Sequence, residues 1–156
     1  MILYHGSTVD IPRIDLQKSK PNKDFGRAFY LSANYDQAME MAQFKAEFAE
    51  LPPIVNVYRF DEKLLREFNY KRFETYTEEW AHFVYNHRTE PQGRTLHDYD
   101  VVFGPIANDT IGAQITRFKQ GYISFEQFLQ RIQYPKGITF QYAFCTQRAI
   151  DKLIKQ

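Results

Sequence analysis

The first eight residues place an imidazole, a glycine and two hydroxyl groups in immediate succession. The chain begins MILYHGST, so His5, Gly6 and Ser7 directly follow a short apolar run. This pattern is typical of the end of a strand. It also provides what a nucleotide site needs, because an imidazole can bond a sugar hydroxyl and a glycine lets a ligand approach the backbone closely. These residues alone leave both interpretations open.

Two later strand segments each contribute one further polar group. Tyr30 lies in GRAFYLS and Gln141 lies in ITFQYAF. Taken singly, Tyr30 can be a core aromatic and Gln141 an outward-facing strand residue. Arg27, three residues before Tyr30, can make paired hydrogen bonds to a pyrophosphate or lie at the surface at the end of a loop. Ser7 can hydrogen-bond His5 or cap the turn that follows it.

The sequence lacks the motifs of several common catalytic classes. It contains no GxxxxGK phosphate loop, no GxGxxG after a strand and no GxSxG nucleophile motif. The single cysteine, Cys145, lies in an apolar strand, where a cysteine acts as a small hydrophobic residue. The four histidines are scattered along the chain, which argues against a Cys/His metal site.

Composition limits the protein class. The chain has 156 residues, of which 44% are apolar, so we expect a single domain over residues 1–156. Its net charge of +1 gives no support for a long-range attraction to nucleic acid or membrane, although a local basic patch stays open. We see no signal peptide and no apolar run long enough to span a membrane, and one cysteine fits a reducing compartment. We therefore expect a cytoplasmic protein.

Apolar alternation and β-branched residues predict five short strands. They lie near residues 2–5, 28–32, 54–60, 99–104 and 138–145. Helical segments separate these strands, and most of the strands have one polar face. The order predicts an α+β fold with mostly antiparallel sheets.

Helix starts are marked by residues that can cap them. Asn34, Thr77 and Ser124 each precede a segment with a helical apolar face. Pro135 and Gly137 are expected to end the helix that begins after Ser124. The segment over residues 108–124 is ambiguous, and the last ten residues, 147–156, are predicted to form an amphipathic helix.

Four segments together resemble a family of small bacterial ADP-ribosyltransferase-like proteins. They are YHGS, DFGRAFYLS, YDVVFGPIAND and FQYAFCTQRAIDKL, and the resemblance extends from Leu3 to Leu153. Many members of that family are known only as a domain of unknown function, and some are considered toxins encoded beside a small partner. The resemblance implies a split β-sandwich that binds NAD, in which a His-Tyr-Glu triad comes from three strands.

The resemblance also implies a role for each matching residue. His5 would bond a ribose hydroxyl, the backbone of Gly6 would bond the nicotinamide carboxamide, and Tyr30 would stack on the nicotinamide ring. Gln141 stands where the wider superfamily has Glu. An amide can hold a ribose hydroxyl, but it cannot accept a proton from an acceptor and carries no charge to stabilise a ribosyl cation.

This departure leaves three alternatives. Another group can supply the base, with Asp24, Asp100 and Glu126 as the candidates. The acceptor can need little activation, or the protein can bind NAD or ADP-ribose without turning it over.

The function expected from this resemblance is transfer of ADP-ribose from NAD to a macromolecular acceptor, as the toxin of a toxin–antitoxin pair with a small antitoxin partner. The alternative is a non-catalytic NAD or ADP-ribose binding module, and a nucleic-acid-binding domain is a weaker third. The loop over residues 10–25, which carries Arg13 and three lysines, is expected to border the NAD cleft as a phosphate-binding lid or to be a mobile loop.

Overall fold

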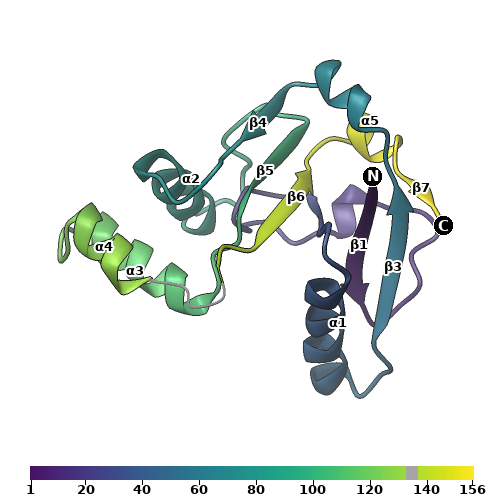
Figure 1. The fold of residues 1–156 in the computed structure, drawn as a ribbon, viewed down its shortest axis with the longest axis horizontal. Coiled ribbons are helices and arrows are strands. Elements are labelled where there is room, and N and C mark those ends of the chain that lie inside the picture. Colours follow the sequence, from purple (N-terminus) through teal and green to yellow (C-terminus); the bar gives the residue numbers. More distant parts are fainter. Residues whose placement is uncertain (133–136) are drawn as a thin grey trace.

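The computed structural model describes residues 1–132 and 137–156, and in them two β-sheets form the centre of the molecule (Figure 1). The three-stranded sheet has the order β1-β3-β7 and the four-stranded sheet the order β2-β6-β5-β4. Among the strand pairs formed by the described residues, β4 and β5 are the one parallel pair. The expected α+β class with mostly antiparallel strands is confirmed, and neither sheet closes into a barrel. The strands are β1 (Ile2–Ser7), β2 (Phe29–Leu31), β3 (Ile54–Arg59), β4 (Tyr70–Arg72), β5 (Val101–Pro105), β6 (Phe140–Phe144) and β7 (Ile154–Lys155).

One hydrophobic core fills the space between the two sheets. Leu3 and Tyr58 are cross-strand partners in β1 and β3, and both are buried there. The four-stranded sheet contributes Phe29, Val101 and Phe144 to the same cluster. Because side chains alternate along a strand, the neighbours of these residues point to the outer faces of the sheets.

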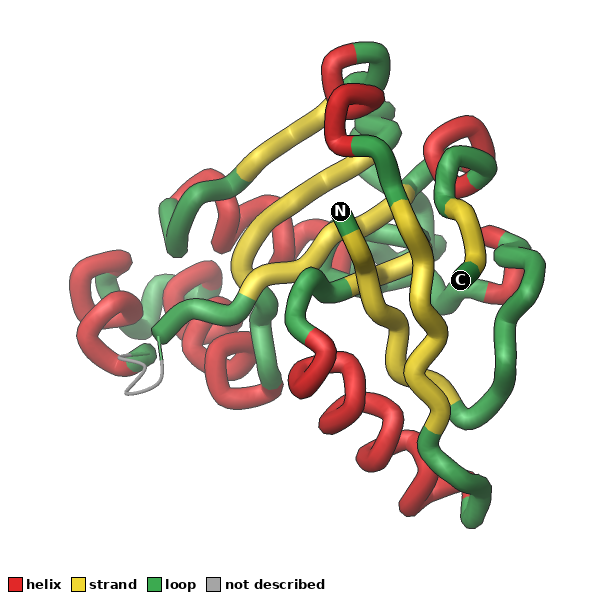
Figure 2. The backbone as a smooth tube through the Cα atoms, turned by 45° about the vertical axis from the view of Figure 1, so that its right-hand side comes forward, coloured by secondary structure: helices red, strands yellow, loops and turns green. Residues whose placement is uncertain are grey.

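Helices cover both outer faces (Figure 2). Helix α1 (Tyr35–Ala49) packs on β1 and β3, while α2 (Glu78–Arg88), α3 (Asp109–Lys119) and α4 (Phe125–Arg131) lie beside the four-stranded sheet. A second core, which includes the fully buried Trp80, lies on that side. The expected caps are confirmed: Asn34, Thr77 and Ser124 each accept a hydrogen bond from a backbone amide of the first turn.

The two sheets join at one point between their edge strands. Tyr4 and Ser32 exchange two backbone hydrogen bonds, each 2.8 Å long. Both β1 and β2 are edge strands, and no pairing between them continues past this bridge. The residues after Tyr4 on β1 and before Ser32 on β2 therefore line a split between the sheets.

The last ten residues differ from the prediction. The expected helix over 147–156 is wrong: α5 spans only Gln147–Ile150, and Ile154–Lys155 form β7 on the edge of β3. The amide of Gln156 donates to the carbonyl of Val57, so pairing with the free edge of β3 replaces the helix. The first part of the segment is helical, and it buries the apolar side chains Ala149 and Ile150.

Two further elements could not be identified from the sequence. Strand β4 is three residues long and was not predicted, and the ambiguous segment forms α3. Pro135, expected to help end α4, lies outside the described residues. Gly137, the other residue expected to end it, is described and has a positive φ of 81°. Across residues 1–132 and 137–156, no helix has the length and apolarity needed to cross a membrane.

Candidate functional site

His5 lies in the split between the sheets. Its Nδ1 is 2.7 Å from the backbone carbonyl of Tyr30, and its ring stacks on Phe29 with centroids 4.4 Å apart. A carbonyl only accepts hydrogen bonds, so Nδ1 carries the proton. Burial, and then the positive charge of Lys45, lowers the pKa of His5 to about 4. The imidazole is therefore neutral at pH 7, and its Nε2 is an acceptor that no described residue bonds.

Two backbone groups hold the hydroxyl of Tyr30 in place. Its hydroxyl donates to the carbonyl of Gly26 at 2.8 Å and accepts from the amide of Phe25 at 2.9 Å. Burial, and then the charge of Asp24, raises the pKa of Tyr30 well above its usual value. The residue is partly exposed, and its ring packs against the second core and stacks on Phe25 with centroids 6.3 Å apart.

Gln141 is oriented by a buried carboxylate. Its Nε2 donates to Oδ2 of Asp24 at 3.0 Å. A carboxylate accepts hydrogen bonds, so this partner selects the amide nitrogen and turns Oε1 away from Asp24. Arg88 holds the other oxygen of Asp24, with Nε at 2.8 Å, and the amide of Ala107 donates to Oδ2 at 3.1 Å. No hydrogen bond to Oε1 of Gln141 is formed by the described residues.

Strand β2 separates the three predicted side chains into two groups. Tyr30 pairs with Ala143 of β6, and Gln141 lies two residues along β6, so Tyr30 and Gln141 share one face of the sheet. His5 lies against Phe29, on the opposite face of β2. It reaches Tyr30 only through the backbone carbonyl. Since β2 is an edge strand, only the free edge of one strand lies between the two groups.

Gly6 has a structural role that its position alone did not indicate. A Cβ there would lie 2.1 Å from the carbonyl oxygen of Ala38 and 2.7 Å from the nitrogen of Ala42, both backbone atoms of α1. The glycine therefore allows helix and strand to touch. Its carbonyl accepts a hydrogen bond from Nζ of Lys45 at 2.7 Å, so one of the backbone groups expected to meet a ligand already has a partner.

Lys45 contacts this end of β1, and Lys20 and Lys23 lie close enough for their charges to act on it. Burial, and then the charges of Lys23 and Lys20, lowers the pKa of Lys45. Within the residues that the structure describes, none of the three forms an ion pair. The amines thus create a local positive potential next to Gly6, which can hold an anionic group.

Ser7 and Arg27 stabilise loops. The hydroxyl of Ser7 accepts from the amide of Val9 at 3.3 Å, which is the turn-capping alternative. The guanidinium of Arg27 donates to the carbonyls of Gln17 and Ser19. These bonds, together with those of Asn56 to Ile11 and Val9, anchor the loop over residues 10–25 at its start and in its middle.

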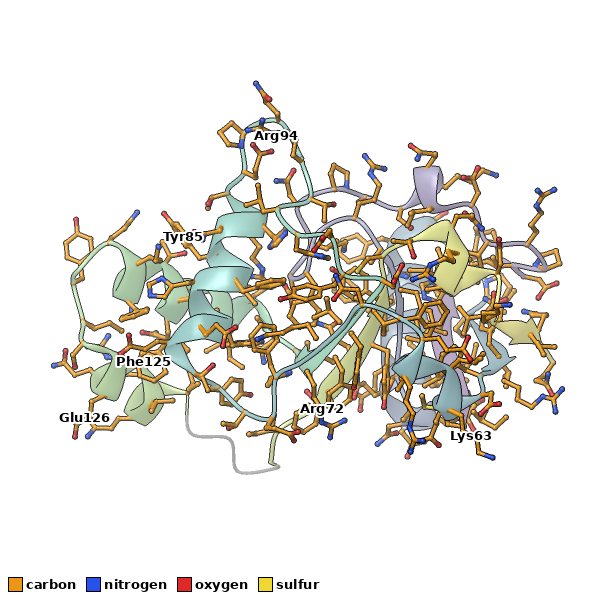
Figure 3. All side chains as sticks on the ribbon, turned by 90° about the horizontal axis from the view of Figure 1, so that it is seen from above. Lys63, Arg72, Tyr85, Arg94, Phe125 and Glu126 are labelled. Atoms are coloured by element: carbon orange, nitrogen blue, oxygen red, sulfur yellow. The ribbon has the colours of Figure 1, made fainter. Side chains whose placement is uncertain are left out.

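The alternative bases differ in position. Asp100 is bound by Arg148, Thr146 and the amide of Asn69 at distances of 2.5 to 2.9 Å. Glu126 is exposed on α4, at the end of the molecule away from the three-stranded sheet (Figure 3). Asp24 alone contacts a predicted site residue.

Cys145 follows β6, and its thiol donates to the carbonyl of Ala143 at 3.4 Å. Burial raises the pKa of its thiol to about 12, so the thiolate is not populated at neutral pH. Cys145 is partly buried and packs against the second core, so only the apolar surroundings that were expected for it are observed.

A family model matches residues 1–155, and its description is "Protein of unknown function (DUF3990)". The chain belongs to the DUF3990 family. No curated protein and no solved structure matches it significantly.

Two hollows in this DUF3990 protein lie apart from the predicted residues. The larger, about 630 Å³, is lined by α3, α4 and their connection, including Arg117, Tyr122 and Arg131. The smaller, about 180 Å³, lies between α2 and α3 and includes Arg88. Arg88 therefore links the Asp24–Gln141 pair to this second surface.

The sequence analysis missed Arg88 and Lys45, and left Asp24 among several candidates. Arg88 lies at the last position of α2, and its partner is 64 residues away, so no local pattern connects them. Lys45 interrupts the apolar face of α1, and this interruption was the one available signal that the residue meets a polar group.

Proposed function

We propose that this chain binds NAD across the free edge of β2, where the split between the sheets opens, and transfers ADP-ribose to a macromolecular acceptor. One observation carries the proposal. His5 and Gln141 are each fixed by an internal hydrogen bond that leaves the second polar atom, Nε2 or Oε1, as a free acceptor. Hydroxyl groups are the natural donors to such atoms, and the two ribose units of NAD supply several.

The remaining groups suit the other parts of a dinucleotide. The partly exposed ring of Tyr30 would provide the stacking surface for nicotinamide, and two backbone groups hold its hydroxyl in place. The amines of Lys20, Lys23 and Lys45 are without ion-pair partners in the described part of the chain, and they suit the pyrophosphate. In this arrangement the ligand lies across the free edge of β2, and so it reaches His5 on one side and Tyr30 on the other.

The transfer needs little proton chemistry at the leaving group. The bond between the ribose and nicotinamide breaks with its electron pair moving to the positively charged ring nitrogen, so nicotinamide departs neutral. The acceptor's nucleophilic atom forms the new bond to the same ribose carbon and releases its proton to water. Positive charge develops on the ribose as in glycoside cleavage. The Gln141 carbonyl, with the Asp24 carboxylate behind it, directs negative potential toward that charge.

The same contacts favour a second candidate, a non-catalytic NAD or ADP-ribose binding module. Both oxygens of Asp24 have protein partners, so this carboxylate is not free to accept a proton from an acceptor. Gln141 cannot do so either. A protein with these residues can hold the ligand firmly without accelerating its cleavage.

Calorimetry with NAD beside a transfer assay with labelled NAD and cell lysate tests the proposal. We expect binding and label transfer for the native chain. Tyr30→Ala removes the stacking surface and should abolish both, whereas Gln141→Ala should mainly reduce transfer. Tyr122→Ala, at an exposed position on the far side, is the matched control and should change neither.

Three results separate the alternatives. Binding without transfer supports the non-catalytic module. Absence of NAD and ADP-ribose binding by the native folded chain contradicts both candidates. Growth arrest on expression, relieved by Tyr30→Ala and by a co-expressed small partner, supports the further proposal that the chain acts as a cytoplasmic toxin with an antitoxin.

A further inference from the structure

Helix α1 exposes an unusual number of large apolar side chains. Met41, Phe44 and Phe48 lie on its outer side, and Leu51 follows its end. Phe44 is 58% exposed and Phe48 is 78% exposed, although both are aromatic. Their rings contact each other edge to face, with centroids 5.0 Å apart. Isolated exposed apolar residues are ordinary, but a contiguous group of this kind marks an interaction surface.

The exposed residues form a stripe distinct from the buried face of the helix. At about 100° per residue, Met41, Phe44 and Phe48 fall within about 60° of one another. Ala38 and Ala42 occupy another side and pack against β1. The helix projects from the three-stranded sheet, and no other described element covers the stripe (Figures 1 and 2). The chain therefore uses one face of α1 internally and leaves a second apolar face open.

A row of carboxylates runs beside the stripe. Asp36, Glu40 and Glu47 lie within about 40° of one another on the helix, next to the apolar side chains. All three are exposed, and none of them forms an ion pair with a described residue. The basic residue of α1, Lys45, lies on the other flank and donates to Gly6 instead. An open apolar stripe thus adjoins an open acidic stripe.

We propose that this surface, the apolar stripe of Met41, Phe44, Phe48 and Leu51 with its acidic flank, binds a basic amphipathic helix of a partner protein. The partner's apolar side chains pack on the stripe and its lysines or arginines lie over the carboxylates. The helical part of the stripe, from Met41 to Phe48, extends over about 10 Å, which matches roughly two turns of a partner helix, and Leu51 lies just beyond it.

The charge pattern selects this occupant over two others. An anionic lipid surface is repelled by the carboxylates that border the stripe. A second copy that packs its α1 antiparallel brings the two acidic flanks together, which is unfavourable. A basic helix alone satisfies both stripes. This proposal does not depend on NAD binding or on transfer.

Peptide binding measured by fluorescence anisotropy tests it. The probe is an amphipathic helical peptide of about 18 residues, roughly five turns, with a leucine stripe and flanking lysines. Two reference peptides are compared with it. One has glutamates in place of the lysines, and the other has the composition of the lysine peptide in a non-amphipathic order. We expect the lysine peptide to bind at least tenfold more tightly than either reference, with affinity that falls as salt rises.

Variants of the native chain assign the contact. Phe44→Ser with Phe48→Ser should weaken binding at least tenfold, because apolar anchors dominate such contacts. Glu40→Lys with Glu47→Lys should reverse the preference toward the glutamate peptide. Leu129→Ser with Glu126→Lys on α4, where both residues are also exposed, is the matched control and should bind like the native chain. Circular dichroism and thermal melting verify that each variant is folded.

Several results overturn the proposal. One is equal affinity of the native chain for the lysine peptide and the reference peptides. Another is unchanged binding by either α1 variant. The third is a loss of affinity in the α4 control as large as in the α1 variants. Sedimentation showing a native dimer that Phe44→Ser with Phe48→Ser dissociates assigns the stripe to a second copy. Binding to vesicles of anionic phospholipid that the same variant abolishes assigns it to a membrane.

Discussion

His5 and the pair His87 and His97 are three covered histidines with different hydrogen bonding. His87 has Nδ1 at 2.8 Å from the carbonyl of Phe83, and its Nε2 accepts from the amide of Leu96 at 3.0 Å. His97 likewise has one nitrogen on the carbonyl of Phe25 and accepts from an amide with the other. His5 uses only Nδ1.

A histidine with both nitrogens bonded to backbone is a fixed part of the scaffold. His87 and His97 hold the loop after α2 against Phe25 and Phe83, and their rings lie 5.3 Å apart. His5 is held by one bond, and its other nitrogen is kept unprotonated by a low pKa. The same side chain thus serves as a connector in one region and as a presented acceptor in the other.

The largest effect is expected on the scaffold side of this comparison. His87→Ala removes a buried ring and leaves the amide of Leu96 without its partner. We expect a loss of about 3 kcal/mol in the free energy of unfolding, measured by urea denaturation. His82→Ala, at a partly covered position whose Nδ1 contacts only Lys119, should cost less than about 1 kcal/mol. An equal loss for the two variants contradicts the assignment of His87 to the scaffold.

Lowering the pH should decrease the free energy of unfolding through all three histidines. Burial is the first cause that lowers the pKa of His5, His87 and His97 in the folded chain. The unfolded chain then binds more protons below pH 6.5, so stability is full above that value and falls as the pH decreases toward 4. Each histidine contributes at most about 1.4 kcal/mol per pH unit.

Urea denaturation between pH 7.5 and 4.5 checks this expectation. A glutamine at position 5 cannot titrate, so His5→Gln should make the free energy of unfolding depend less steeply on pH, by the contribution of one histidine. A stability that is constant, or that rises as the pH falls over this range, contradicts the neutral state inferred for the three rings.

His5→Ala should separate binding from stability. The variant loses the bond to the Tyr30 carbonyl and the stacking on Phe29, which we expect to cost about 1 kcal/mol. Loss of Nε2 should weaken NAD or ADP-ribose binding about tenfold in calorimetry, the effect of one hydrogen bond. His97→Ala is the matched control, since it should lower stability more and leave the affinity of the remaining folded protein unchanged. The reverse pattern assigns His5 to the scaffold.

The sequence predicted the elements more fully than their contacts. Asn34, Thr77 and Ser124 were recognisable as caps because an N-cap bond spans only two or three residues. The strands around His5, Tyr30 and Gln141 were recognisable from alternation. Strand β7 was not, because two residues carry no periodicity and their pairing depends on the free edge of β3.

Contacts over long separations account for most of what the sequence left open at the candidate site. Gln141 and Asp24 are 117 residues apart, and nothing near either residue indicates the other. Gly6 was noted as a glycine that a ligand can approach, yet the atoms that approach it belong to α1. A glycine indicates that something comes close to the backbone, but identifying that neighbour requires the fold.

The smallest expected effect concerns the amine that contacts the strand beside His5. Lys45→Gln can retain a hydrogen bond to the carbonyl of Gly6 but removes the positive charge. If that charge helps to hold the pyrophosphate, NAD affinity should fall about threefold at low salt and less at high salt, because screening weakens the native contact. Loss of a neighbouring charge should also let the pKa of His5 rise, since Lys45 is the second cause of its depression. Calorimetry at two salt concentrations and NMR titration of His5 measure these effects, with Lys119→Gln on α3 as the control. An unchanged affinity together with a raised His5 pKa shows that Lys45 tunes the histidine without contacting the ligand.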